Sequence, residues 1–494
     1  MPHDPTLVRL ANATLLVPFE AYKAPRWILD GLAEGISGVC LFHNNLESAE
    51  QITELNAHLA EATDTPLISL DEEGGDVTRI GQAHGSEYPG NAALGAVDDP
   101  DLTRATLRSL GGQLTELGFN LDLAPTVDVN VADDNPVIGT RSFGSDPELV
   151  ARHATAAVLG LQESGVAACA KHFPGHGATS QDSHHVLPRV EAEADLLRTR
   201  ELLPFRAAVD AGVRSILTAH IEMPALGGPG PATLDHRILH GVLRDELGFT
   251  GSVISDAMEM QGVSGRIGIP EASVLAVAAG CDLLCLGRFV YADGVEAVRS
   301  ALVEAVRDGR LSGERLEEAA ERNAQLRAWV RGAATREAPL VADDIGLSGA
   351  RRAARVLGVL PPLRDPFVVE VDAPANVAVG EVPWGLDPWF PKVERVAPDP
   401  AAAERILDTV GDHDLVVVVR DAHRCPDARA LTARLLKARP EAVVVEMGLP
   451  IWLPECGAHV STYGAAHVNG RTAAELLGAP GAVDAAPDQG LRGR

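Results

Sequence analysis

The sequence predicts an α/β protein in which a (β/α)8 TIM barrel is followed by a smaller α/β sandwich domain. Three observations support this fold class. The chain has 494 residues, which is too long for one ordinary hydrophobic core. Eight short apolar runs alternate with amphipathic segments over roughly the first 300 residues, as expected for a barrel of about 250 residues with insertions. The last third of the chain has an α/β pattern of its own.

The eight apolar runs are the expected strands of the barrel. Each is nearly continuous in apolar residues, which is typical of parallel strands that are covered on both faces. The runs occupy residues 13–19, 38–44, 66–73, 119–130, 166–175, 215–224, 251–260 and 281–289.

The segments between these runs are expected to be helices, because their apolar residues recur at i, i+3 and i+4. The clearest of them are residues 47–62, 101–118, 147–165 and 270–280, and a further helix is expected at 311–330. Gly118 and Gly165 end two of these segments just before a strand, which suits a left-handed helix C-cap.

The second domain is predicted to begin after a polar stretch rich in alanine and glycine. We expect a barrel domain over 1–332, a linker over 333–349 and a sandwich domain over 350–494. Within the last domain the expected strands are 366–372, 414–421, 442–448 and 459–464, and the expected helices are 428–440 and 471–478. The strand ends here lack a dense set of polar residues, so we expect this domain to provide packing or the rim of a site.

The composition argues against several function classes. With 42 basic and 69 acidic residues the net charge is −27, which repels nucleic acids and anionic membranes. No apolar run is long enough to span a bilayer, and the start MPHDPTLVRL lacks a signal-peptide pattern. The six cysteines form no CxxC pair, so buried free thiols are expected. We therefore expect a cytoplasmic enzyme that binds neither nucleic acid nor membrane; the sequence does not predict its oligomeric state.

Polar residues gather where the predicted barrel strands end. They are Asp71, Asp122, Lys171 with His172, His220 with Glu222, and Asp256. The carboxyl ends of the strands hold the active site in barrels of this class, so we expect these side chains to converge. Lys171 is one of only four lysines in a chain rich in arginine, which suggests a need for a compact ammonium group.

Three roles are open for Asp256, which follows an apolar strand: nucleophile, metal ligand, or N-cap of the next helix.

Lys171 and His172, with Arg79 and Arg141, form a cationic set that could hold hydroxyl groups or a carboxylate. A nucleotide site is disfavoured, because no glycine-rich phosphate loop accompanies these residues.

Asp182 and His184 are two residues apart, and in an extended segment such residues project to one side. The aspartate can then fix the imidazole tautomer and leave the other nitrogen to exchange protons. Gly175 and Gly177 precede the pair, which indicates a mobile loop. His185 is expected to point the other way.

The same stretch contains five possible metal ligands: His172, His176, Asp182, His184 and His185. There is no HxxxH on a helix and no thiolate partner, and the intervening glycines make a poor rigid cage. We expect no metal and no cofactor.

Five stretches together resemble glycoside hydrolase family 3, in its β-N-acetylglucosaminidase (NagZ-like) branch. They are KHFPGHGATSQDSHHVLP (171–188), DEEGGDVTRI (71–80), LDLAPTVDVN (121–130), NPVIGTRSFGSDP (135–147) and VISDAMEM (253–260), and the match covers roughly residues 5–330. The resemblance of the C-terminal domain to the second domain of two-domain members is looser.

This resemblance implies a retaining mechanism on a GlcNAc-containing saccharide or muropeptide. It implies that Asp256 is the nucleophile and that His184 is the acid/base, assisted by Asp182. It also implies sugar-binding roles for five residues: Asp71, Arg79, Arg141, Lys171 and His172. A histidine base is neutral when deprotonated, so phosphate could replace water as the acceptor.

One departure from the family pattern is the sequence after Asp71, where Glu72 and Asp76 add negative positions that we expect at the mouth of the site.

Three alternative functions remain: a family-3 β-glucosidase, an inert sugar-binding protein on the same barrel, and a metal-dependent amidohydrolase-like barrel. A β-glucosidase usually has a glutamate acid/base in the second domain, an inert protein needs no proton shuttle, and a metal enzyme would lose activity on chelation.

Overall fold

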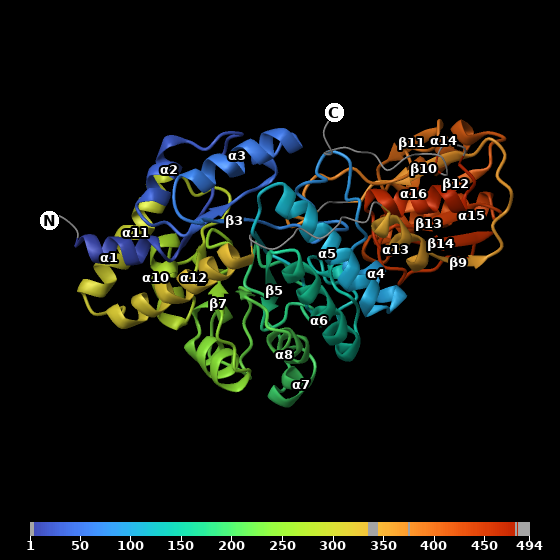
Figure 1. Cartoon of the computed structure of the whole chain (residues 1–494). Coiled ribbons are helices and arrows are strands. Elements are labelled where there is room, and N and C mark those ends of the chain that lie inside the picture. Colours follow the sequence, from blue (N-terminus) through green and yellow to red (C-terminus); the bar gives the residue numbers. More distant parts are fainter. Residues whose placement is uncertain (1–3, 334–343, 374–375, 480–481, 483–494) are drawn as a thin grey trace.

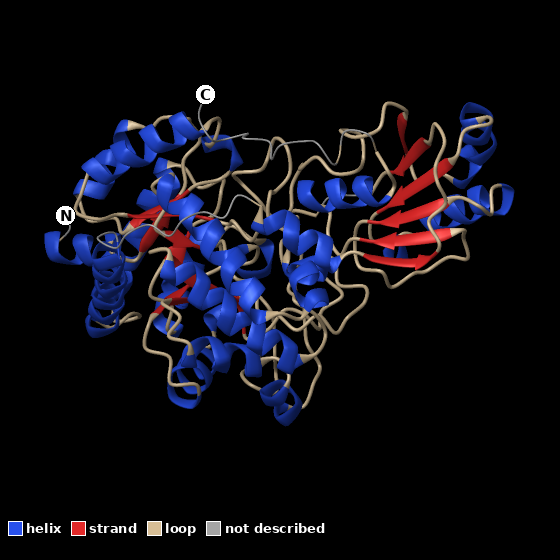
Figure 2. Ribbon diagram, turned by 45° about the vertical axis from the view of Figure 1, so that its right-hand side comes forward, coloured by secondary structure: helices blue, strands red, loops and turns tan. Residues whose placement is uncertain are grey.

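A computed structural model describes residues 4–333, 344–373, 376–479 and 482 of the chain. Figure 1 shows a helix-covered barrel in the N-terminal two thirds and a separate sheet with its own helices in the C-terminal third. Figure 2 shows the strands of the second sheet side by side, with helices on both of its faces. The predicted fold class is confirmed.

The first sheet has eight parallel strands in the order β7-β6-β5-β4-β3-β2-β1-β8. A parallel bridge between Ile254 and Leu283 brings β7 beside β8 and closes the barrel. Every strand lies inside a predicted run but is shorter than that run: β1 (Leu15–Val17), β2 (Gly38–Cys40), β3 (Leu67–Leu70), β4 (Leu121–Asp122), β5 (Ala167–Phe173), β6 (Ser215–Thr218), β7 (Ser252–Ile254) and β8 (Leu284–Cys285).

The helices surround the barrel, and the five expected from periodicity are present as α3, α5, α6, α10 and α12. Asp99 and Asp146 cap α5 and α6 through their side chains. Gly118 and Gly165 follow these two helices with φ of +86° and +91°, as predicted. The helices are α1 (Pro5–Asn12), α2 (Arg26–Ala33), α3 (Ala49–Glu61), α4 (Asn91–Val97), α5 (Pro100–Glu116), α6 (Pro147–Glu163), α7 (Ala194–Thr199), α8 (Leu202–Asp210), η4 (Arg237–Glu246), α9 (Gln261–Ser264), α10 (Ile269–Ala279), α11 (Ala292–Arg307) and α12 (Gly313–Ala333), with short turns η1 (His43–Asn45), η2 (Gly139–Arg141) and η3 (Ala232–Leu234).

The barrel interior is filled by apolar side chains from most of its strands, together with Leu326 and Val330 of α12. Arg327 and Arg331 of the same helix contact Asp64, which precedes β3, so α12 lies under the amino ends of the strands. The opposite, carboxyl end is therefore the one left for a site. Four of the six free cysteines are buried in the barrel domain, as expected: Cys40, Cys169, Cys281 and Cys285.

The second sheet has six strands in the order β11-β10-β12-β13-β14-β9. All pairings are parallel except that of β14 with β9. Four strands and two helices were predicted, and β9 and β11 were not. The elements are β9 (Arg355–Gly358), β10 (Phe367–Val371), β11 (Val393–Val396), β12 (Leu415–Val419), β13 (Val443–Glu446) and β14 (Ala458–Ser461), with α14 (Ala403–Val410), α15 (Pro426–Ala438), α16 (His467–Leu476), η5 (Pro400–Ala402) and η6 (Ala422–Arg424).

The last residues of the predicted linker, 333–349, form the start of a helix instead of an unstructured connection. Residues 334–343 lie outside the described part of the chain, but α13 (Ile345–Ala353) is a helix that contacts α4, α5 and α16. Gly346 permits this close approach, since a Cβ there would lie 1.9 Å from the carbonyl oxygen of Glu87. The end of the expected linker is thus packed against both domains.

Among the described residues, no helix combines the length and the apolar character needed to cross a membrane.

Candidate functional site

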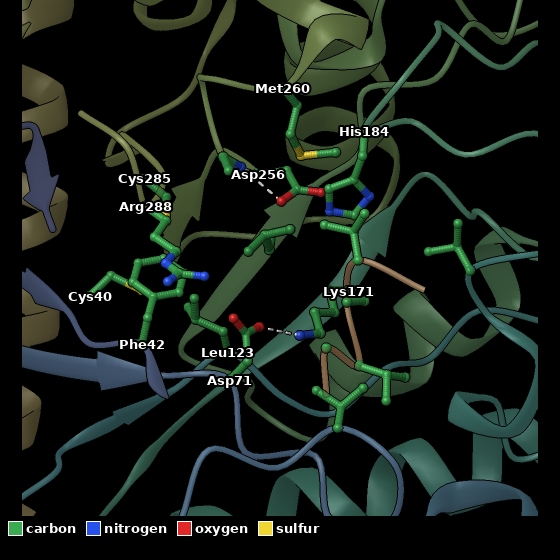
Figure 3. A pocket seen from close by; sticks show the side chains of 18 of the residues that line it. Cys40, Phe42, Asp71, Leu123, Lys171, His184, Asp256, Met260, Cys285 and Arg288 are labelled. Atoms are coloured by element: carbon green, nitrogen blue, oxygen red, sulfur yellow. Dashed lines mark hydrogen bonds and ion pairs between the residues drawn. The ribbon is translucent and has the colours of Figure 1, made fainter. Parts of the chain in front are cut away.

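A pocket of about 260 Å³ opens at the carboxyl end of the barrel strands. Figure 3 shows Asp71, Lys171, His184 and Asp256 around it. Seven of the eight predicted site residues line it: Asp71, Arg79, Arg141, Lys171, His172, His184 and Asp256. Asp182, the eighth, supports His184. The second domain adds residues 377–380 to the wall, which agrees with its expected role as a rim.

Lys171 is buried between two carboxylates. Its Nζ lies 2.6 Å from Asp71 Oδ1 and 2.7 Å from Glu73 Oε1. Burial lowers the pKa of the ammonium, but Asp71 and Glu73 outweigh this effect and hold the pKa above its usual value. Lys171 is therefore a permanent cation whose donors have fixed directions.

Arg141 shares Glu73 with Lys171. Its Nη2 and Nε donate to Oε1 and Oε2 of Glu73 at 2.7 and 3.0 Å, in a bidentate pair. Burial raises the pKa of Glu73, but Arg141 and Lys171 outweigh it, so the pKa lies below its ordinary value. Both cations already have a carboxylate partner. The site around them therefore suits the neutral hydroxyl groups of a ligand, and a carboxylate ligand at Lys171 and Arg141 is disfavoured.

His172 has a defined tautomer. Its Nε2 lies 3.2 Å from Arg141 Nη2, and a guanidinium only donates, so Nε2 is the acceptor. The Nδ1–H then donates to Asp128 Oδ2 at 2.7 Å. Asp128 was not predicted as a site residue; the signal for it is an acid inside the apolar run 119–130.

Asp256 follows β7 and enters the pocket. Its Oδ1 accepts the backbone N–H of Ala257 at 2.8 Å, while the next helix, α9, is capped at Met260. The N-cap role is therefore wrong. Burial raises the pKa of the carboxyl, but His220, His172 and His184 outweigh it and hold the pKa below its usual value. Asp256 is thus ionised at neutral pH.

His184 and Asp182 form the expected pair. His184 Nδ1 lies 2.7 Å from Asp182 Oδ1, and the same oxygen accepts the backbone N–H of His184 at 2.8 Å. The expected extended conformation is wrong, because the N–H groups of His185 and Val186 both donate to the Asp182 carbonyl and make a turn. In Figure 3 the imidazole of His184 faces Asp256.

His176 is a residue to which the sequence assigned no role. Its Nε2 lies 3.0 Å from Ser183 Oγ and its Nδ1 lies 2.8 Å from Thr179 Oγ1. Burial, with His172, lowers the pKa of His176 to about 4, so the ring is neutral at pH 7. The ring connects the end of β5 to the loop that contains His184. His185 is exposed.

Several other polar residues at the strand ends lie outside the pocket lining. Asp122 accepts the N–H of Glu72, and His220 Nε2 lies 3.1 Å from the carbonyl oxygen of Ala257. Glu222 contacts Arg189. These residues support neighbouring backbone instead of entering the site.

The negative charges expected at the mouth are not there. Glu72 Oε2 accepts the backbone N–H groups of Arg79 and Ile80 at 2.7 and 3.0 Å. Asp76 is buried and forms an ion pair with Arg420 of the second domain at 3.1 Å. Both side chains are buried and lie outside the pocket lining, which overturns the expectation that they add negative charge at the mouth of the site.

No three histidine, cysteine, aspartate or glutamate side chains converge as metal ligands within the described ranges.

A sequence model described as the glycosyl hydrolase family 3 N-terminal domain matches residues 22–326. The chain belongs to glycosyl hydrolase family 3. The predicted resemblance is confirmed, and with it the expectation of a glycoside hydrolase.

Relatives within family 3 include Beta-hexosaminidase A of Pseudoalteromonas piscicida, 34% identical over 317 residues. That match covers 59% of this chain and only 53% of the relative's length. Beta-hexosaminidase of Neisseria meningitidis serogroup B is 36% identical over 262 residues, covering 51% of this chain and 72% of the relative.

Among solved structures, a glycoside hydrolase family 3 beta-N-acetylglucosaminidase from Paenibacillus sp. is similar over 95% of this chain and 96% of its own, at 31% identity and a TM-score of 0.85. The two-domain family-3 architecture therefore extends over nearly the whole chain.

Proposed function

We propose that this chain is a retaining, exo-acting β-N-acetylglucosaminidase that removes terminal β-linked GlcNAc through a covalent glycosyl-enzyme intermediate. The names of its relatives support the substrate class. The main structural support is the Asp182–His184 pair, whose imidazole faces the Asp256 carboxylate across one pocket (Figure 3).

In the first step, Asp256 attacks C1 of the sugar and the bond from C1 to the leaving oxygen breaks. His184 gives its Nε2 proton to that oxygen, while Nδ1–H donates to Asp182 and stabilises the imidazolium. In the second step, neutral His184 takes a proton from water, the water oxygen bonds to C1, and the Asp256 carboxylate leaves.

Five residues would hold the hydroxyl groups of the non-reducing sugar and direct C1 toward the nucleophile: Asp71, Arg79, Arg141, Lys171 and His172. The paired state of Lys171 and Arg141 supports this role, since fixed donors orient a neutral sugar without requiring it to be charged. The wall formed by residues 377–380 restricts the pocket and favours exo action.

The test uses two variants and two aryl β-GlcNAc substrates, one with an activated and one with a poor leaving group. Asp256→Ala should abolish cleavage of both. His184→Ala should reduce kcat/KM by about 10²–10⁴-fold on the poor leaving group and far less on the activated one, because only the poor one needs a proton. Equal losses on both substrates would contradict the acid/base role of His184.

A second candidate is phosphorolysis by the same site. The base of the Asp182–His184 pair is neutral after proton transfer, so it does not repel an anionic acceptor as a carboxylate would. Turnover with and without phosphate separates the two, since hydrolysis gives GlcNAc and phosphorolysis gives GlcNAc-1-phosphate. A β-glucosidase with a glutamate acid/base from the second domain is disfavoured, because the second-domain residues that line the pocket are Val377, Ala378, Val379 and Gly380.

A further inference from the structure

Arg288 differs from the other cations of the pocket. It follows β8 and lines the pocket, and Figure 3 shows its side chain reaching inward beside Cys285 and Phe42. Its Nε is buried and has no hydrogen-bond partner. Within the described residues, no ion pair joins its guanidinium to a carboxylate. Arg288 is half-buried as a residue, and its solvent-shielded Nε–H without a partner costs free energy that an acceptor in contact with it would recover.

The other permanent cations of the lining already have acceptors. Lys171 and Arg141 bind Asp71 and Glu73 at 2.6 to 2.7 Å. Arg79 donates to the Ala378 carbonyl at 3.0 Å and lies 4.0 Å from Asp71. The positive charge of Arg288 is therefore the one in this lining that a bound anion could neutralise directly.

Glu259 holds the backbone of Arg288 in place but does not neutralise its side chain by contact. Its two carboxylate oxygens accept the N–H groups of Arg288 and Phe289 at 2.6 and 2.7 Å. Gly287 makes this possible, because a Cβ at that position would lie 2.5 Å from the Glu259 side chain, and its φ is +90°. Glu259 thus binds the backbone of the turn through both oxygens and leaves the guanidinium donors of Arg288 available to a ligand.

The surroundings of Arg288 suit a ring-shaped group with a negative substituent. The Phe289 ring is 62% exposed, and its centroid lies 5.2 Å from the guanidinium carbon. His43 lines the same side; burial lowers its pKa, and Arg288 and Arg79 lower it further, which indicates a positive local field.

We propose that Arg288 and Phe289 form the leaving-group subsite and that this subsite selects an oxyanion, either a carboxylate on the leaving group or an acceptor phosphate. The inference rests on the proposed function, since it places the leaving group beyond the sugar held at Lys171. A carboxylate would receive two donors from the guanidinium fork, and the Phe289 ring would cover the face of the attached ring.

A matched pair of substrates tests this subsite: 3-carboxyphenyl β-GlcNAc and its uncharged 3-carbamoylphenyl counterpart. The wild type should favour the carboxylate in kcat/KM, and Arg288→Gln should lower that preference by about tenfold or more, as expected for a charge-assisted bond. Arg288→Lys should retain part of it. Arg310→Gln is the control, because Arg310 is an exposed arginine after α11 that pairs with Glu271. If Arg288→Gln keeps the preference for the carboxylate substrate, Arg288 does not bind a carboxylate on the leaving group.

The second possible oxyanion, an acceptor phosphate, is tested by adding inorganic phosphate to reactions with the uncharged substrate. Formation of GlcNAc-1-phosphate that depends on Arg288 would identify phosphate as the occupant. In that step a phosphate oxygen bonds to C1, the bond from C1 to Asp256 breaks, and its electron pair returns to the carboxylate. If neither the carboxylate preference nor the phosphate response changes in Arg288→Gln, the subsite is overturned.

A binding measurement separates this inference from the proposed function. Titration calorimetry with 3-hydroxybenzoate, 3-hydroxybenzamide and inorganic phosphate needs no turnover. Tighter binding of either anion to the wild type than to Arg288→Gln supports the subsite, and equal binding overturns it. Failure of the wild type to cleave the uncharged glycoside would instead count against the proposed hydrolase.

Discussion

Adjacent glutamates in the stretch after β3 have opposite environments. Glu73 contacts two buried cations, and they hold its pKa below the ordinary value although burial acts in the other direction. Glu72 accepts hydrogen bonds from backbone N–H groups, and burial raises its pKa. Two adjacent glutamates therefore have different tasks: Glu73 pairs with Lys171 and Arg141 of the pocket, and Glu72 supports the backbone at residues 79 and 80.

The same substitution at both positions tests this difference. Glu73→Gln leaves Arg141 without its carboxylate and Lys171 with Asp71 alone, so we expect a loss of about 3 kcal/mol or more in the free energy of unfolding. We also expect kcat/KM to fall by about 100-fold, because the sugar-binding donors lose their fixed directions. Glu72→Gln should cost below about 1 kcal/mol, since an amide oxygen can still accept the backbone bonds.

Chemical denaturation and steady-state kinetics on an aryl β-GlcNAc measure both effects. If the two substitutions cost the same, the pairing of Glu73 with the two cations is not what distinguishes these residues.

The sequence predicted some of these residues and missed others for a physical reason. Lys171 and Asp256 were predicted because each lies near the carboxyl end of an apolar strand, which is the end of a barrel that holds the site. Glu73 and Asp128 were missed, since irregular backbone after a strand does not reveal which side chains face inward. Arg288 was missed because an arginine in a loop has no periodic signal.

At the scale of elements, the loop after β5 is held by hydrogen bonds within the loop and by bonds to the segment after β4. Ser183, next to the proposed acid/base residue His184, binds His176, whose backbone N–H in turn donates to Asp128 at 2.6 Å. The hydrogen bonds from Asp128 through His176 to Ser183 therefore link the carboxyl end of β5 to the loop that contains His184. His176 is best described as a positioning residue.

Ser183→Ala should loosen this loop while leaving the Asp182–His184 pair intact. Loss of one buried hydrogen bond, about 1 kcal/mol, should lower kcat/KM by about fivefold on a poor leaving group and have little effect on an activated one. Ser180→Ala is the matched control, because Ser180 is exposed on the same loop. A loss of equal size on both substrates would show that Ser183 affects binding of the sugar and not proton transfer.

The elements themselves were predictable where burial is uniform. All eight barrel strands, and β10, β12 and β13 of the second sheet, lie in apolar runs, but their lengths were overestimated, because residues beyond the last ladder bond remain buried in loops. β14 begins one residue before its predicted range, 459–464. β9 is an antiparallel edge strand whose four residues are exposed, and β11 has two adjacent charged residues, Glu394 and Arg395, between two valines. Neither has the continuous apolar run that identified the others. The sequence predicted that Asp182 contacts His184, and the two side chains do so. The prediction assumed an extended segment, whereas the backbone forms a turn there.

At the scale of the whole molecule, the second domain is joined to the barrel beside the site. Asp76 accepts the N–H of Ala465 at 2.8 Å and the hydroxyl of Thr140 at 2.6 Å, in addition to its ion pair with Arg420. Residues 377–380 of the same domain line the pocket. Asp76 departs from the family pattern at this position, and its structural consequence is a buried link between the domains.

A double-mutant cycle on Asp76 and Arg420 measures this link. Removing one partner leaves the other charge buried, so each single alanine variant should be strongly destabilised, with a coupling of about 1–3 kcal/mol between them. The exposed interdomain pair Asp99–Arg352, with side chains 33% and 48% exposed, is the control and should couple by less than about 1 kcal/mol. Similar coupling in the two pairs would mean that burial does not strengthen the Asp76–Arg420 link.

Asp76→Ala should also raise KM for the aryl β-GlcNAc more than it lowers kcat, because the pocket wall at residues 377–380 moves while Asp256 and His184 stay in place. An unchanged KM would mean that the second domain covers the pocket independently of Asp76.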